Sequence, residues 1–212
     1  MRRLPVYLLI DTSGSMTGEP IEAVKVGLQT MVSALRSDPY ALETAFLSVI
    51  TFSDRAAQTV PLTELVQFQI PDLRACGMTA LGGALALLAD CIERDVRKTT
   101  AEAKGDWKPV CFLLTDGQAT DDLNRGIEAL RRVKVGTLVA CAAGPAAKPD
   151  ELRKITEAVV TLDTADSNTL KAFFQWVSAS VSVSSQKLDL TKKEVGGLDE
   201  LPPPPPEVNV AL

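Results

Sequence analysis

Three short segments carry oxygen-bearing side chains in a pattern that suits cation binding. They are Asp11-Thr12-Ser13-Gly14-Ser15, Gly77-Met78-Thr79 and Thr115-Asp116-Gly117. The 212-residue sequence contains no histidine, so a conventional zinc site and a Ser-His catalytic pair are both excluded. Carboxylate and hydroxyl oxygens are the ligands that Mg²⁺, Mn²⁺ and Ca²⁺ prefer. Taken singly, however, each segment is better explained as a helix cap or a tight turn.

The spacing of these segments favours one shared site. Asp11, Ser13 and Ser15 alternate, so a tight loop can direct all three side chains at one point. Asp11 and Asp116 each follow an apolar run, and two carboxylates placed together repel unless a cation neutralises them. We therefore predict a site for Mg²⁺, or alternatively Mn²⁺ or Ca²⁺, with the ligands Asp11, Ser13, Ser15, Thr79 and Asp116. Five side chains, some acting through water, leave a coordination position open for the carboxylate of a binding partner.

The elements that must position these residues alternate between strand and helix. Near-continuous apolar runs indicate strands that helices cover on both faces. The predicted strands are Val6–Ile10, Ala45–Phe52, Gln58–Leu62, Val110–Leu114, Thr137–Ala142 and Ala158–Leu162. The predicted helices begin at Pro20, Leu81, Asp121, Pro149 and Ser167. This alternation predicts a mostly parallel α/β sheet, in which ligands bind at the carboxyl ends of the strands.

Composition and charge limit the classes of function. Ordinary globular composition and this length predict one domain, residues 1–185, followed by a polar, Pro-rich tail, residues 186–212, that is flexible and has no core to join. A net charge of −5 argues against nucleic-acid binding, and no apolar run is long enough to span a membrane. The N-terminal apolar run ends at Asp11, too early for a signal peptide. With four cysteines in no paired spacing, we expect a reduced, cytoplasmic protein.

The sequence resembles the von Willebrand factor type A (VWA) domain family. Asp11, Ser13 and Ser15 match its D-x-S-x-S motif, Thr79 its separate threonine and Asp116 its later aspartate, over a resemblance covering about residues 4–185. The resemblance implies a metal-ion-dependent adhesion site, in which an acidic residue of a protein partner completes the coordination. It also implies a Rossmann-like three-layer sandwich with helices on both faces of a mostly parallel six-stranded sheet. The short antiparallel edge strand of that sheet is then Gln58–Leu62.

Further segments are similar to the TerY-like proteins of bacterial tellurite-resistance gene clusters. They are G-x-P-I-E-A-V at Gly18–Val24 and L-L-T-D-G-x-x-T-D at Leu113–Asp121. This narrower resemblance implies a partner that is a protein kinase or phosphatase encoded nearby.

Two alternatives to a protein-binding module stay open at this stage. A metal-dependent phosphatase-like enzyme would use Asp11 as a nucleophile, but it needs a second aspartate two residues on, where this chain has Ser13. Without that general acid, phosphoryl transfer loses a factor on the order of 10²–10⁴. No P-loop motif occurs either. The other alternative is a scaffold whose site is empty. We expect a binding module and not an enzyme.

Overall fold

A seven-stranded, mostly parallel sheet forms the centre of the molecule. The computed structural model describes residues 2–191 and 201–211. The strands lie in the order β3-β2-β1-β4-β5-β6-β7 and are β1 (Leu4–Asp11), β2 (Ala45–Phe52), β3 (Ala56–Glu64), β4 (Val110–Thr115), β5 (Thr137–Ala143), β6 (Val159–Leu162) and β7 (Asn209–Val210). Strands β2, β1, β4, β5 and β6 are parallel to one another, so their carboxyl ends meet at one edge.

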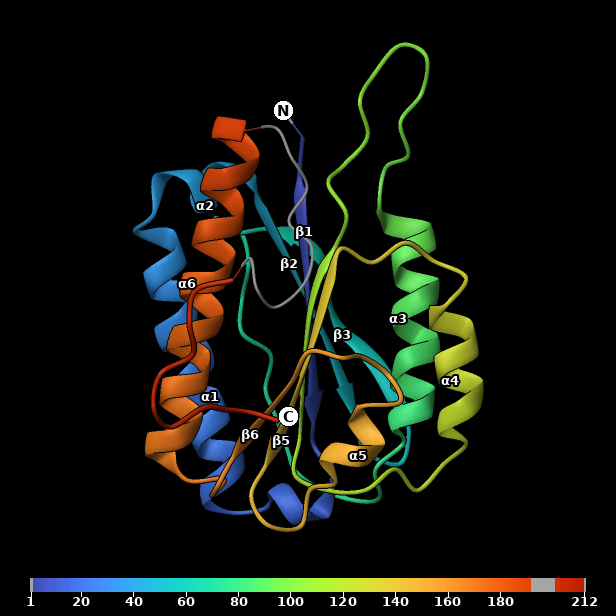
Figure 1. Ribbon diagram of the computed structural model, residues 1–212, viewed down its shortest axis with the longest axis vertical. Coiled ribbons are helices and arrows are strands. Elements are labelled where there is room, and N and C mark those ends of the chain that lie inside the picture. The colour runs from blue at the N-terminus through green and yellow to red at the C-terminus, as the bar shows by residue number, and fades with distance from the viewer. Residues whose placement is uncertain (1, 192–200, 212) are drawn as a thin grey trace.

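Helices cover both faces of this sheet, as Figure 1 shows. On one face lie α1 (Glu19–Arg36), α2 (Pro39–Thr44) and α6 (Ser167–Thr191), and on the other lie α3 (Leu81–Asp95), α4 (Leu123–Leu130) and α5 (Pro149–Leu152). Alternate residues of β1 serve the two cores: Val6 and Leu8 pack on the α1/α6 side, Tyr7 and Leu9 on the α3 side. The predicted three-layer α/β architecture is confirmed. Among the described residues, no helix is long and apolar enough to cross a membrane.

One edge of the sheet differs from the prediction. The antiparallel edge strand expected at Gln58–Leu62 is present as β3, and its half-exposed alternation fits an edge position. A seventh strand, β7, lies antiparallel to β6 at the opposite edge. The prediction of six strands with one antiparallel edge was therefore wrong by this short strand.

The Pro-rich segment is packed against the domain. Leu201 and Val208, on either side of the prolines, are buried in the α1/α6 core. The indole Nε1 of Trp176 donates a hydrogen bond of 2.8 Å to the carbonyl oxygen of Pro202. The expectation that this segment has no core to join was wrong for residues 201–211, because these two apolar side chains anchor it. The predicted division of the chain at residue 185 falls inside α6, and part of the predicted tail, residues 192–200, lies outside the described residues.

Helices α3 and α4 are in backbone contact through two glycines. A Cβ atom added to Gly82 would lie 2.3 Å from the carbonyl oxygen of Asp122, and one added to Gly126 would lie 2.3 Å from that of Gly82. A methyl group at either position would force the two helices apart. The contact matters for the site described below, because α3 begins directly after Thr79 and Ala80.

We predict that Gly82→Ala lowers the free energy of unfolding by about 1–3 kcal/mol, the usual cost of overpacking. Gly83→Ala is the matched control, because Gly82 and Gly83 both donate their backbone N–H to the carboxylate of Asp121. A Cβ atom on Gly83 meets no atom closer than 3.5 Å, so this variant should match the wild type or gain about 0.5–1 kcal/mol. Urea denaturation of the two variants checks this, and equal stabilities would contradict the close packing.

Candidate metal centre

Asp11 ends β1 at the carboxyl edge of the sheet and is fully buried. Its Oδ1 accepts a hydrogen bond of 2.8 Å from the backbone N–H of Ser13. Its Oδ2 accepts one of 2.6 Å from the hydroxyl of Thr115, the last residue of the adjacent strand β4. The carboxylate is therefore held from both sides. The sequence analysis included Thr115 in an oxygen-bearing segment but gave it no role. The direction in which its hydroxyl points depends on the register of β1 against β4.

The loop after β1 brings three of the predicted residues into one hydrogen-bonded row. The chain turns through a short 3-10 helix, η1 (Gly14–Met16), which places the hydroxyls of Ser13 and Ser15 2.9 Å apart. The Ser15 hydroxyl donates to Oδ1 of Asp116 at 2.6 Å. Two chain segments 101 residues apart thus share one row of oxygen atoms.

Thr79 comes to the same place from the loop before α3. Its backbone N–H donates to the hydroxyl of Thr120 at 3.0 Å, and its carbonyl oxygen accepts the Thr120 N–H at 2.9 Å. A Cβ atom built on Gly117 would lie 3.5 Å from the Thr79 hydroxyl oxygen and 3.8 Å from that of Ser15. Both hydroxyls therefore border Gly117, next to Asp116. The structure brings together all five side chains that the sequence singled out.

Backbone hydrogen bonds between the loops fix this arrangement. The N–H of Gly14 donates to the carbonyl of Gly77 at 3.0 Å, and the N–H of Cys76 donates to that of Thr12 at 2.9 Å. Gly77 has a φ of 75°, in the left-handed region that favours glycine, and a Cβ atom there would lie 2.6 Å from the carboxylate of Asp54. A side chain at position 77 would therefore disturb the loop that carries Thr79.

The electrostatics of the site favour a bound cation. Burial raises the pKa of Asp11, and the nearby charge of Asp116 raises it further, although hydrogen bonds from Ser13 and Thr115 partly offset the shift. Burial likewise raises the pKa of Asp116, against a hydrogen bond from Ser15. The hydrogen bonds described for these carboxylates come from hydroxyl and backbone N–H groups, which carry no compensating charge. A divalent cation would supply that charge.

The donor set fits a hard cation. In the described part of the chain, no three His, Cys, Asp or Glu side chains cluster in a way that would hold a metal. A cation at this position would therefore depend on hydroxyl oxygens as well as on the two carboxylates. Neutral and anionic oxygens without nitrogen or sulfur suit Mg²⁺, Mn²⁺ or Ca²⁺.

The fold and the composition of this site define a VWA-type module, and comparison with known proteins agrees. The model of the von Willebrand factor type A domain matches residues 6–176, and the chain belongs to this family. An uncharacterized protein of Synechocystis sp. is 33% identical over 146 residues, which are 66% of this chain and 30% of that protein. The chain thus spans less than a third of that relative.

Solved structures share the fold at low sequence identity. A von Willebrand factor type A protein from Catenulispora acidiphila is 23% identical, with a TM-score of 0.56 over 86% of this chain and 43% of that one. Proximal thread matrix protein 1 of the mussel byssus, with a zinc-occupied MIDAS motif, is 22% identical. Its TM-score is 0.60, and the match covers 87% of this chain and 46% of the mussel protein. The pilus adhesin SpaC of Lactobacillus rhamnosus GG, in an open conformation, is 14% identical. Its TM-score is 0.64, and the match covers 86% of this chain and 30% of the adhesin.

We predict that Mg²⁺ or Mn²⁺ raises the melting temperature of the wild type but not of Asp11→Ala or Asp116→Ala. A metal at 100 times its dissociation constant raises the free energy of unfolding by about 2.7 kcal/mol. At this chain length, each kcal/mol raises the melting temperature by about 2–4 °C. The expected shift is therefore about 5–10 °C, rising with metal concentration. Differential scanning calorimetry with metal and with EDTA measures it. An identical response in all three proteins would contradict a metal site.

We further predict that Thr115→Val weakens metal binding by about 10–100-fold, the usual effect of removing a residue that orients a ligand. Valine has nearly the shape of threonine but leaves Oδ2 of Asp11 without its hydrogen bond. Thr115→Ser keeps the hydroxyl and is the control. Isothermal titration with Mn²⁺ compares the two variants, and equal affinities would show that Thr115 does not position Asp11.

Proposed function

We propose that the chain is a metal-ion-dependent protein-binding module. In this proposal a divalent cation, Mg²⁺ before Mn²⁺ or Ca²⁺, is held by Asp11, Ser13, Ser15, Thr79 and Asp116, and an Asp or Glu carboxylate of a partner protein completes its coordination. The observation that carries the proposal is the row of oxygen atoms Ser13–Ser15–Asp116 beside the buried carboxylate of Asp11. A metal ion in such a site supplies a Lewis-acidic position that attracts an anionic oxygen ligand.

The balance of charge supports an acidic partner. Two carboxylates balance the two positive charges of the cation, and the hydroxyls add oxygen ligands without further charge. A partner's carboxylate would therefore meet a neutral centre rather than an anionic one. The zinc-occupied MIDAS motif of the mussel protein supports metal uptake by a site of this fold, although oxygen ligands alone favour harder cations than zinc.

The surroundings of the site support a protein partner. Met78, next to Thr79, is 57% exposed, whereas Met16 on the other loop is fully buried. An exposed thioether side chain beside a metal site offers apolar contact area to a partner.

Two side chains near Asp11 that could act as proton donors in the enzymatic alternative, those of Ser13 and Asp121, both have other contacts. The position two residues after Asp11 is Ser13, whose hydroxyl is hydrogen-bonded to Ser15. Asp121, an acid in the neighbouring loop, accepts two backbone N–H groups at the start of α3. Asp121 therefore has a structural role at the start of α3, and Ser13 belongs to the proposed ligand set, which supports the binding module over a phosphatase-like enzyme.

The likeness to TerY-like proteins suggests where to look for the partner. Under the proposal, it is a protein kinase or phosphatase encoded near this chain in a bacterial tellurite- or stress-response gene cluster. The sequence segments Gly18–Val24 and Leu113–Asp121 are the support for this narrower assignment. The second segment includes Asp116 of the candidate metal site, and the first begins three residues after Ser15.

We predict that purified partner candidates are retained by the immobilised chain in Mg²⁺ and released by EDTA. Asp116→Asn removes one of the two negative charges that balance the metal, so the site should lose the metal. Without the metal, the partner should no longer be retained. Asp122→Asn is the matched control. Asp122 accepts a hydrogen bond from the N–H of Arg125 at the start of α4, a role that asparagine fills equally well. Retention that is insensitive to chelator, or loss in both variants, would contradict the proposal.

A further inference from the structure

A basic hollow lies at the end of the sheet opposite to the candidate metal centre. It has a volume of about 550 Å³ and lies between the end of α3, the segment before β4 and the turn before β5. The metal centre lies at the other ends of the same parallel strands. With about 3.3 Å per residue, the eight residues of β1 separate the two by roughly 25 Å.

Basic side chains outnumber acidic ones in the walls of this hollow. Six of its lining residues are basic, namely Arg2, Arg97, Lys98, Lys108, Arg132 and Lys134. Its acidic residues are Glu93 and Asp106, and Asp106 is already bound to the guanidinium of Arg3. This concentration of positive charge stands out in a chain whose net charge is −5.

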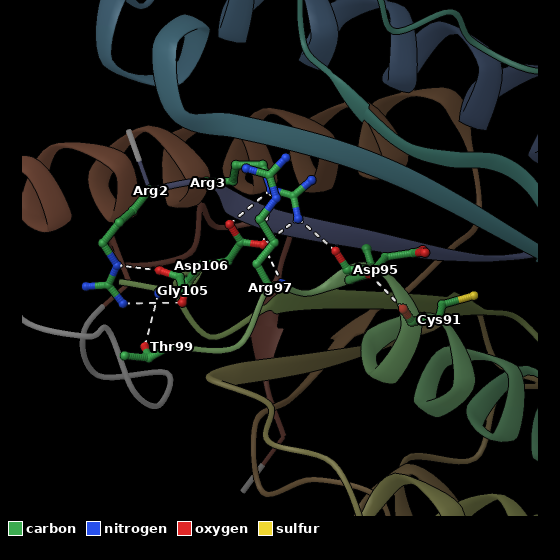
Figure 2. Close-up of polar contacts among 9 residues, drawn as sticks. Arg2, Arg3, Cys91, Asp95, Arg97, Thr99, Gly105 and Asp106 are labelled. Carbon is green, nitrogen blue, oxygen red and sulfur yellow. Dashed lines mark hydrogen bonds and ion pairs between the residues drawn. The ribbon is translucent and has the colours of Figure 1, made fainter. Parts of the chain in front are cut away.

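The rim of the hollow is held in place by its own contacts, which Figure 2 shows. Arg2 donates to the carbonyl oxygens of Gly105 and Asp106 at 2.7 and 3.3 Å. Its guanidinium carbon lies 3.4 Å from the centre of the Trp107 ring, a cation–π contact. Asp106 also accepts the backbone N–H of Arg97 at 2.8 Å. Arg2 therefore orders the segment, whereas the exposed side chains of Arg97 and Arg132 face solvent.

Beneath the cations lies an apolar floor. It is made by Ile92, Val96, Trp107, Pro109 and Val133. We propose that the hollow binds a small organic phosphate, with its phosphate groups on the basic rim and its carbon skeleton on this floor. One guanidinium group can donate two parallel hydrogen bonds to the oxygens of a phosphate. The volume of the hollow falls within the range of small-molecule sites. The proposal does not rest on the metal centre.

Isothermal titration of the full chain with ADP, pyrophosphate and adenosine tests this proposal. ADP should bind saturably and at least about ten-fold more tightly than pyrophosphate, because only ADP reaches both the rim and the floor. A ten-fold difference in affinity corresponds to about 1.4 kcal/mol. Adenosine, without phosphate, should not bind measurably. Failure of ADP to bind, or equal affinities for ADP and pyrophosphate, would overturn the proposal.

A pair of double variants separates the hollow from general charge attraction. Arg97→Gln with Arg132→Gln should weaken ADP binding at least about ten-fold, through lost charge-assisted hydrogen bonds. Arg125→Gln with Lys171→Gln removes the same charge from exposed positions that do not line the hollow, and it should change affinity less than about two-fold. Equal losses in both double variants would show unspecific attraction and overturn the assignment.

Discussion

Two carboxylates at the ends of neighbouring strands are the constraint around which this molecule is organised. Ile10 on β1 is paired in register with Leu114 on β4, so Asp11 and Asp116 follow at the same edge of the sheet. Both are buried, and burial together with mutual repulsion raises the pKa of Asp11. Folding therefore brings together two carboxylates whose negative charges repel each other. Hydrogen bonds and a bound cation would offset this repulsion.

The surrounding structure acts to hold that arrangement. Hydroxyls of Thr115 and Ser15 donate to the two carboxylates, and the contacts of Gly14 with Gly77 and of Thr79 with Thr120 fasten the loops together. The glycine contact between α3 and α4 fixes the helix that follows Thr79. These interactions prearrange the oxygen atoms, so that metal binding would require little reorganisation of the chain.

The sequence was sufficient to predict the central sheet and which side chains come together at its edge, but not the contacts between those side chains. Buried parallel strands are continuous apolar runs, and Asp11, Ser13 and Ser15 are close in the chain, so local patterns reveal both. The hydrogen bond from Thr115 to Asp11 depends on the register between strands more than 100 residues apart. Likewise, Leu201 and Val208 anchor the C-terminal segment as single apolar residues around a proline run, and two isolated positions form no periodic pattern.

One end of the sheet carries the acidic metal centre and the other carries the basic hollow. Helix dipoles explain only part of this difference in charge. Helices α3 and α4 begin near the metal centre and end near the basic hollow, where the dipole favours cations such as Arg132 and Lys134. Arg2 precedes a strand, however, and Lys108 lies just before β4, so a helix end does not account for either. Strands and helices from separate parts of the chain thus supply positive charge to one hollow. Helix capping alone would place cations only at the helix ends, so their convergence favours a bound anion.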